Sequence, residues 1–137
     1  MNIEYSNSIN GFLSDLEYTS LLQESSIILN LPESRFNHDY SNPSVLIGAN
    51  LRDFEVPTCG SLLLTQANEE IKSLFEDDKE IVTFKNEWEM VDKAIFYLKN
   101  PNILLKIAEA GNLRVKKEHL WEHRFTNLFK YLKQNHL

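Results

Sequence analysis

The sequence predicts an α/β fold in three layers, with a short parallel sheet, helices on both of its faces and a helical C-terminus. Three short apolar runs, at residues 26–31, 61–65 and 80–84, have the length and the residue types of strands. Helical patterns separate these runs, and the chain after residue 85 shows helical periodicity alone. Strands that alternate with helices form parallel sheets, and right-handed crossovers are expected to place helices on both faces.

Length and composition predict one globular domain that covers residues 1–137. A chain of 137 residues, with 42% hydrophobic residues, four glycines and four prolines, is typical of a single folded domain. The net charge of −6 argues against nucleic-acid binding, because phosphate backbones attract basic proteins. Arg114, Lys116 and Lys117 form a basic cluster, but Glu118 follows at once, which is typical of a solvated helix face.

The first elements are expected to be a short strand at residues 3–6 and a helix over residues 13–24. Ser14 and Glu17 have the spacing of a capping box, in which each side chain bonds to the other residue's backbone N–H. The buried face of this helix is expected to contain Leu16, Leu21 and Leu22.

A strand, a loop and a short helix are expected next. Residues 26–31 predict a strand that is buried on both sides, as in parallel sheets. The polar residues 32–43 predict a loop. The helix at residues 51–58 is expected to stop at Gly60, with Pro57 near its end.

The middle of the chain repeats this order. A strand at residues 61–65 is followed by a helix at 68–75 and by the third strand at 80–84. Asn86 is expected to cap the next helix, with Glu89 at the capping-box position. The apolar face of that helix is expected to contain Val91, Ile95 and Leu98.

Two more helices are predicted to complete the chain. Asn100 and Pro101 are expected to start the first of them, with proline at the first helical position. Gly111 is expected to let this helix approach another element closely. Its apolar stripe contains Leu104, Ile107, Ala108, Gly111 and Val115. The last amphipathic stretch contains Trp121, Phe125, Leu128, Phe129 and Leu132.

Cysteine content and hydropathy predict a cytoplasmic protein. Cys59 is the single cysteine, so no intrachain disulfide can form, which suits a reducing compartment. The first residues are polar and do not have the pattern of a secretory leader. No apolar stretch approaches the ~18 residues that a membrane-spanning helix needs.

The most informative segment reads Asn-Leu-Arg-Asp-Phe-Glu at residues 50–55, reaches Gly60 and continues into Leu-Leu-Leu-Thr at residues 62–65. It resembles the nucleotide-sugar-binding, C-terminal domain of CgeB-like, group 1 glycosyltransferases, which are two-domain enzymes of the GT-B type. Further similar pieces occur, in the family's order, at residues 74–82, at 107–111 and from His119 to Arg124. The resemblance implies a partial Rossmann-like domain, and it covers residues 16–132.

The resemblance also implies a site for a nucleotide-sugar of the UDP or GDP type. Glu55 matches the family's ribose-binding glutamate, and a carboxylate can accept two hydroxyl hydrogen bonds from ribose. Free N–H groups at a helix N-terminus around Asn50 and Leu51 can meet a diphosphate. Arg52 can add charged donors to the phosphate oxygens. We expect neither a metal nor a cofactor.

Two departures from the family's pattern limit this interpretation. Many relatives have a second glutamate eight positions before the ribose-binding one, and here that position is Ile47. The strands that open the family's domain, and the acceptor-binding domain that usually supplies the catalytic base, are not recognisable. The catalytic residue is therefore unknown, and we expect the isolated chain to be inactive. A second copy or a partner domain is expected to cover the open sheet edge.

Three other interpretations compete with the first. The chain can be a non-catalytic remnant or an accessory, protein-binding subunit of a glycosyltransferase. Arg52 and Glu55, three residues apart on a helix, can simply pair with each other. Residues 119–123 fit the H-x-x-E-H signature of inverted zinc proteases, but no acidic residue follows His123 to supply a third ligand. Cys59 is expected to be packed rather than nucleophilic.

Overall fold

The computed structural model describes residues 13–31 and 48–135. The strand predicted at residues 3–6 and the loop predicted at residues 32–43 lie outside these ranges, as does Ile47. The elements are α1 (Asp15–Glu24), β1 (Ile27–Asn30), α2 (Arg52–Cys59), β2 (Leu62–Gln66), α3 (Glu69–Leu74), β3 (Val82–Phe84), α4 (Glu87–Lys99), α5 (Pro101–Glu118) and α6 (Trp121–Gln134).

The described strands form one parallel sheet in the order β1-β2-β3. Ile28 in β1 is in register with Leu63 in β2, and Leu64 in β2 is in register with Val82 in β3. Strand β2 is central and is buried from Leu62 to Thr65. Among the described residues β1 lies at the edge, and its Leu29 is 41% exposed. The prediction that this strand is fully buried on both faces is therefore wrong. Ile27 and Ile28 pack into the cores on opposite faces of the sheet but stay partly exposed, and Leu29 is exposed because the strand lies at the edge.

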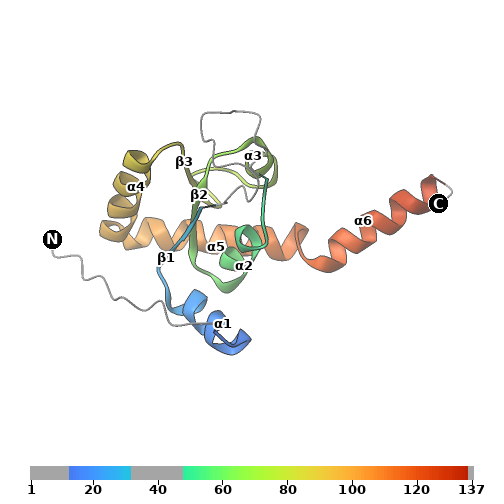
Figure 1. Cartoon of the computed structure of the whole chain (residues 1–137), viewed down its shortest axis with the longest axis horizontal. Coiled ribbons are helices and arrows are strands. Elements are labelled where there is room, and N and C mark those ends of the chain that lie inside the picture. The colour runs from blue at the N-terminus through green and yellow to red at the C-terminus, as the bar shows by residue number, and fades with distance from the viewer. Residues whose placement is uncertain (1–12, 32–47, 136–137) are drawn as a thin grey trace.

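Helices cover both faces of the sheet, as predicted (Figure 1). On one face, Leu22 of α1, Val56 of α2 and Ile71 of α3 pack with Leu63 of β2. On the other face, α4 and the first half of α5 pack on the strands through Tyr97, Leu104, Ile107 and Ala108. Each fully buried aliphatic side chain contributes about 1.5–3 kcal/mol, so these two clusters dominate the stability of the fold.

Helix α1 has the predicted cap but a narrower buried face than predicted. The Ser14 hydroxyl accepts from the backbone N–H of Glu17, and the Glu17 carboxylate accepts from the N–H of Ser14 at 2.8 Å. Leu22 is buried, whereas Leu16 is 82% exposed and Leu21 is half exposed. The prediction for Leu16 and Leu21 is wrong because, within the described residues, α1 packs on the core through the side that carries Tyr18 and Leu22.

Helix α4 begins at the predicted cap, Asn86, whose side chain accepts from the N–H of Glu89 at 2.9 Å. The Glu89 carboxylate accepts from the N–H of Lys85, one residue earlier than a capping box would use. The predicted apolar face is wrong, because Val91 and Leu98 are exposed. The residues that pack on the sheet are Met90, Ala94 and Tyr97.

Helix α5 passes very close to the sheet at Gly111, as predicted. A Cβ atom at this position would clash with the backbone carbonyl oxygen of Glu80, which lies just before β3. Asn112, the next residue, donates to the carbonyl oxygens of Pro57 and Thr58 at 2.9 and 2.8 Å. These contacts satisfy carbonyl groups at the C-terminus of α2, which ends at Gly60 in a left-handed conformation, with φ of 88°.

Helix α6 projects away from the rest of the molecule (Figure 1). None of its described residues is buried. Its apolar stripe is exposed to solvent and contains Trp121, Phe125, Leu128 and Phe129. Within the ranges that the structure describes, no helix combines the length and the apolar character needed to cross a membrane.

Candidate functional site

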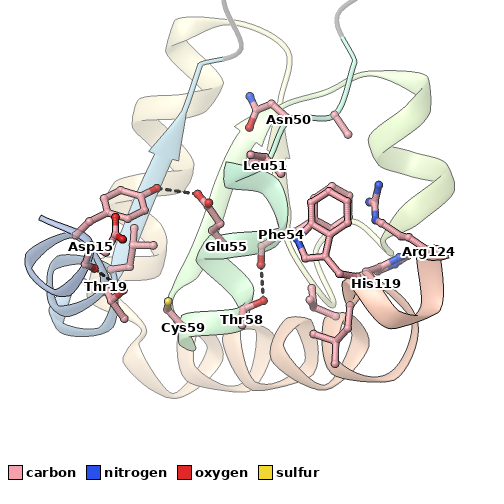
Figure 2. Close-up of a pocket in the computed structure, with 16 residues that line it drawn as sticks. Asp15, Thr19, Asn50, Leu51, Phe54, Glu55, Thr58, Cys59, His119 and Arg124 are labelled. Carbon is pink, nitrogen blue, oxygen red and sulfur yellow. Dashed lines mark hydrogen bonds between the residues drawn. The ribbon is translucent and has the colours of Figure 1, made fainter. Parts of the chain in front are cut away.

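A cavity of about 820 Å³ lies over the outer face of α2 (Figure 2). Helix α2 forms its floor, α1 forms one wall, and the junction between α5 and α6 forms the opposite wall. The volume falls within the ~300–1,000 Å³ that is typical of small-molecule sites. The residues that line the cavity include Tyr18, Asn50, Leu51, Phe54, Glu55, Cys59, His119, Trp121 and Arg124.

The N-terminus of α2 is capped by the chain's own side chains. The Asn50 side chain accepts from the backbone N–H of Arg52, and the Asp53 carboxylate accepts from the N–H of Asn50, both at 2.9 Å. The Glu70 carboxylate accepts from the N–H of Ala49, also at 2.9 Å. The sequence predicts free N–H groups here, but those of Asn50 and Arg52 are already bonded. Among the described residues, the Leu51 N–H has no recorded acceptor.

Asp53 is the residue that sequence analysis overlooked at this end of the helix. It is 1% exposed, and its carboxylate accepts from the Asn30 amide at 2.7 Å and from the Thr65 hydroxyl at 3.0 Å. These bonds and the N-terminus of α2 stabilise a buried charge that would otherwise be costly. Asp53 thereby joins α2 to the carboxyl ends of β1 and β2. The spacing Asn50-x-x-Asp53, a variant of the capping box, is the signal that identifies it.

Glu55 points from α2 towards the wall that α1 forms (Figure 2). The Tyr18 hydroxyl donates to the Glu55 carboxylate at 2.9 Å. None of the ion pairs among the described residues joins Arg52 to Glu55, so the competing interpretation of a simple Arg52–Glu55 pair is not supported. The Arg52 side chain is exposed.

The Tyr18 hydroxyl is neutral and acts as a donor. Burial is the largest influence and raises the pKa of Tyr18; the Arg52 guanidinium opposes this effect, and the Glu55 carboxylate reinforces it. A tyrosine with a raised pKa keeps its proton at physiological pH, so it can donate to a carboxylate.

The opposite wall carries a positive charge next to aromatic rings. The guanidinium carbon of Arg124 lies 4.4 Å from the ring centroid of Phe54 and 6.0 Å from that of Trp121. The Trp121 ring is exposed and stacks on Phe125. The cavity therefore has an acidic wall at Glu55 and a basic, aromatic wall at Arg124. Sequence analysis missed Tyr18 and Arg124 because both lie far from residues 50–55 in the chain.

The two histidines of the H-x-x-E-H string do not share a helix. His119 is the residue that follows the last turn of α5, and its Nε2 atom is 3.1 Å from the carbonyl oxygen of Leu74. His123 lies in the first turn of α6. The inverted zinc-protease arrangement requires both histidines on one helix, and the α5–α6 junction prevents this. His119 instead packs against the rings of Phe54 and Phe75.

Cys59 lines the cavity as a half-buried thiol. Burial raises its pKa, and the nearby Glu55 carboxylate raises it further. The thiolate is the nucleophilic form, so a raised pKa makes this cysteine unreactive. The packing role predicted for Cys59 fits this environment.

The sequence of this chain matches a known protein family. A family model described as glycosyl transferase-like matches residues 4–130. The chain belongs to this glycosyl transferase-like family. The match includes every described wall of the cavity, from α1 to the first turns of α6. Neither the curated proteins nor the solved structures contain a significant match to the chain.

Proposed function

We propose that this chain is the nucleotide-sugar-binding module of a CgeB-like, group 1 glycosyltransferase, equivalent to the C-terminal domain of a GT-B enzyme. Completed by an acceptor-binding domain, it transfers a sugar from a nucleotide-sugar donor during glycan biosynthesis. The observation that carries the proposal is the Glu55 carboxylate on the wall of a ligand-sized cavity, in a chain of glycosyl transferase-like sequence. The proposed site of action is the cytoplasm, where Cys59 remains a free thiol.

In this proposal the nucleotide lies along the N-terminal half of α2. Glu55 accepts hydrogen bonds from the ribose hydroxyls, while the Leu51 N–H and the Arg52 guanidinium bind the diphosphate. Leu51 and Glu55 are four residues apart, so they lie on one face of the helix, one turn from each other. The N–H of Asn50 is bonded to Asp53, so Asn50 contributes by capping the helix that presents the other three residues.

The proposal is tested by titrating the chain with UDP, GDP and the corresponding nucleosides and following the backbone amide NMR spectrum. We expect weak binding, because the open site leaves the phosphates in water, where charged contacts are screened. A Kd near 1 mM corresponds to only about −4 kcal/mol, a range that NMR detects. The diphosphates are expected to bind more tightly than the nucleosides. An unchanged spectrum at several millimolar of every ligand would refute nucleotide binding and leave the accessory-subunit alternative.

We also propose that a second copy of this chain covers the exposed apolar surfaces. These surfaces are the stripe on α6 and the edge of β1, where Leu29 and Leu31 are exposed. Residues 121–134 carry three basic side chains and one acidic side chain, a net charge of +2, whereas the chain as a whole carries −6. The remaining residues together carry −8, so α6 is complementary in charge to the body of another copy.

A further inference from the structure

Helix α1 supplies a hydrogen-bond donor to the proposed nucleotide site. Tyr18 lies 37 residues before Glu55 in the chain, yet its hydroxyl donates to Oε2 of that glutamate at 2.9 Å. Among the described residues, Tyr18 is the hydrogen-bond partner of the Glu55 side chain. A glutamate on a helix surface otherwise samples many rotamers. The bond therefore selects one orientation of the carboxylate.

The position of Tyr18 is itself fixed by packing. Its ring is half-buried and packs against the cluster that contains Leu22, Val56 and Leu63. The Ser14–Glu17 capping box holds the N-terminus of α1 one turn before Tyr18. The hydroxyl thus comes from a helix anchored in the core rather than from a free surface side chain. A donor held in this way can restrict its acceptor.

We propose that Tyr18 is a positioning residue that orients the Glu55 carboxylate for the ribose diol. This inference rests on the nucleotide-binding function proposed above. Tyr18 occupies one lone pair of Oε2 and leaves Oε1 and the second lone pair of Oε2 as acceptors for the two ribose hydroxyls. Because the carboxylate is already oriented, less rotamer freedom is lost when the nucleotide binds.

The test compares UDP with its 2′,3′-dideoxy analogue, which lacks both hydroxyls, by NMR titration of the wild-type chain and of Tyr18→Phe. We expect Tyr18→Phe to weaken UDP binding roughly threefold to tenfold, the range for one lost hydrogen bond. Binding of the dideoxy analogue should weaken less than that of UDP, because the analogue makes no bond to Glu55. Any effect of Tyr18→Phe through the Arg52 guanidinium acts on the diphosphate and is therefore shared by both ligands. In a Glu55→Ala background, where Tyr18 has no acceptor left at position 55, Tyr18→Phe should have little further effect on UDP binding.

Tyr97→Phe is the matched control. The Tyr97 hydroxyl donates to the Asp78 carboxylate at 3.1 Å, the same kind of bond, and neither residue lines the cavity. We expect Tyr97→Phe to leave the Kd of both ligands unchanged. An equal loss for UDP and the dideoxy analogue in Tyr18→Phe would show a merely structural role and overturn the proposal. A gain in UDP affinity would show that Tyr18 blocks Glu55, and would also overturn it.

A measurement on the wild-type chain avoids dependence on the folding of any variant. The ring carbon that bears the Tyr18 hydroxyl, labelled with ¹³C, reports whether that hydroxyl is bonded to a carboxylate. We expect its shift to stay in place as UDP saturates the site. A move to the shift of a water-exposed tyrosine would show that the ribose displaces Tyr18, which contradicts positioning. If UDP does not bind at all, the proposed function fails first and this inference fails with it.

Discussion

A single buried carboxylate, Asp53, holds the candidate site together at the scale of residues. It is bonded to Asn30 on β1, to Thr65 on β2 and to the backbone of Asn50. Without the Asp53 carboxylate, the Asn30 side-chain amide, the Thr65 hydroxyl and the Asn50 N–H would each lose an acceptor. Buried polar groups without partners destabilise a fold by about 1–3 kcal/mol each.

Asp53→Ala should therefore lower the free energy of unfolding by about 2–4 kcal/mol, measured by urea denaturation. Asp92→Ala is the control. Asp92 and Asp53 are both helical aspartates, but Asp92 is exposed whereas Asp53 is buried. Asp92→Ala should change stability by less than about 0.5 kcal/mol. Equal effects of the two substitutions would contradict the role given to Asp53.

Arg52 and Glu55 are expected to act on different parts of the nucleotide. Arg52→Ala should weaken UDP binding but leave uridine almost unchanged, because only the diphosphate offers oxygens to the guanidinium. Glu55→Gln should weaken both ligands, by roughly 1–2 kcal/mol, because both contain ribose. Lys116→Ala, an exposed basic residue outside the cavity, serves as the charge control in the same NMR titrations. Equal loss of UDP and uridine in Arg52→Ala would contradict the assignment.

At the scale of elements, helix starts were more predictable from sequence than helix faces. The sequence predicts the capping residues Ser14 and Asn86 and the first helical residue Pro101, because each depends on local chemistry alone. The face of α4 was predicted wrongly, because this helix has two apolar stripes and periodicity cannot rank them. Lys93 donates to the carbonyl of Thr83 at 2.7 Å, and this contact helps to turn the stripe with Tyr97 towards the sheet.

The candidate site was predictable only in part for a similar reason. Glu55 and Arg52 lie in one contiguous segment, so the family resemblance could locate them. Tyr18 and Arg124 reach the cavity from α1 and α6, and their contribution depends on how those helices pack. The capping role of Asn50 depends on two hydrogen bonds, to the Asp53 carboxylate and to the Arg52 N–H, and these bonds occupy amide groups that the sequence alone indicates as free.

The crossing of α5 at Gly111 gives a prediction at the same scale. Replacing a glycine with alanine inside a helix usually stabilises a protein by about 1 kcal/mol. Here the added Cβ would meet the backbone carbonyl of Glu80, which cannot easily move. Gly111→Ala should therefore destabilise the fold, by about 1–3 kcal/mol in thermal or urea unfolding. Glu109→Ala, at an exposed position of α5, should stay within about 0.5 kcal/mol of wild type. Stabilisation by Gly111→Ala would contradict the close approach.

At the scale of the whole molecule, the sheet is short and the apolar surface is large. Strand β2 is covered on both sides, but β1 leaves Leu29 exposed, and α6 extends from the body with its aromatic residues in solvent (Figure 1). Large contiguous apolar patches on soluble proteins usually mark interfaces. The same helix supplies Arg124 and Trp121 to the cavity wall, so assembly through α6 would also order one side of the proposed nucleotide site.

We expect the chain to self-associate through the apolar stripe of α6. Light scattering at micromolar concentration should show a dimer or a larger species. Phe125 is half exposed and stacks between Trp121 and Phe129, so Phe125→Glu places a charge in the middle of the stripe and should shift the population towards monomer. Asn127→Glu adds the same charge to the same helix, but helical geometry puts residue 127 on the opposite face, so the oligomer should persist. A monomeric wild-type chain, or equal dissociation by both variants, would show that the α6 stripe does not pair with a second copy.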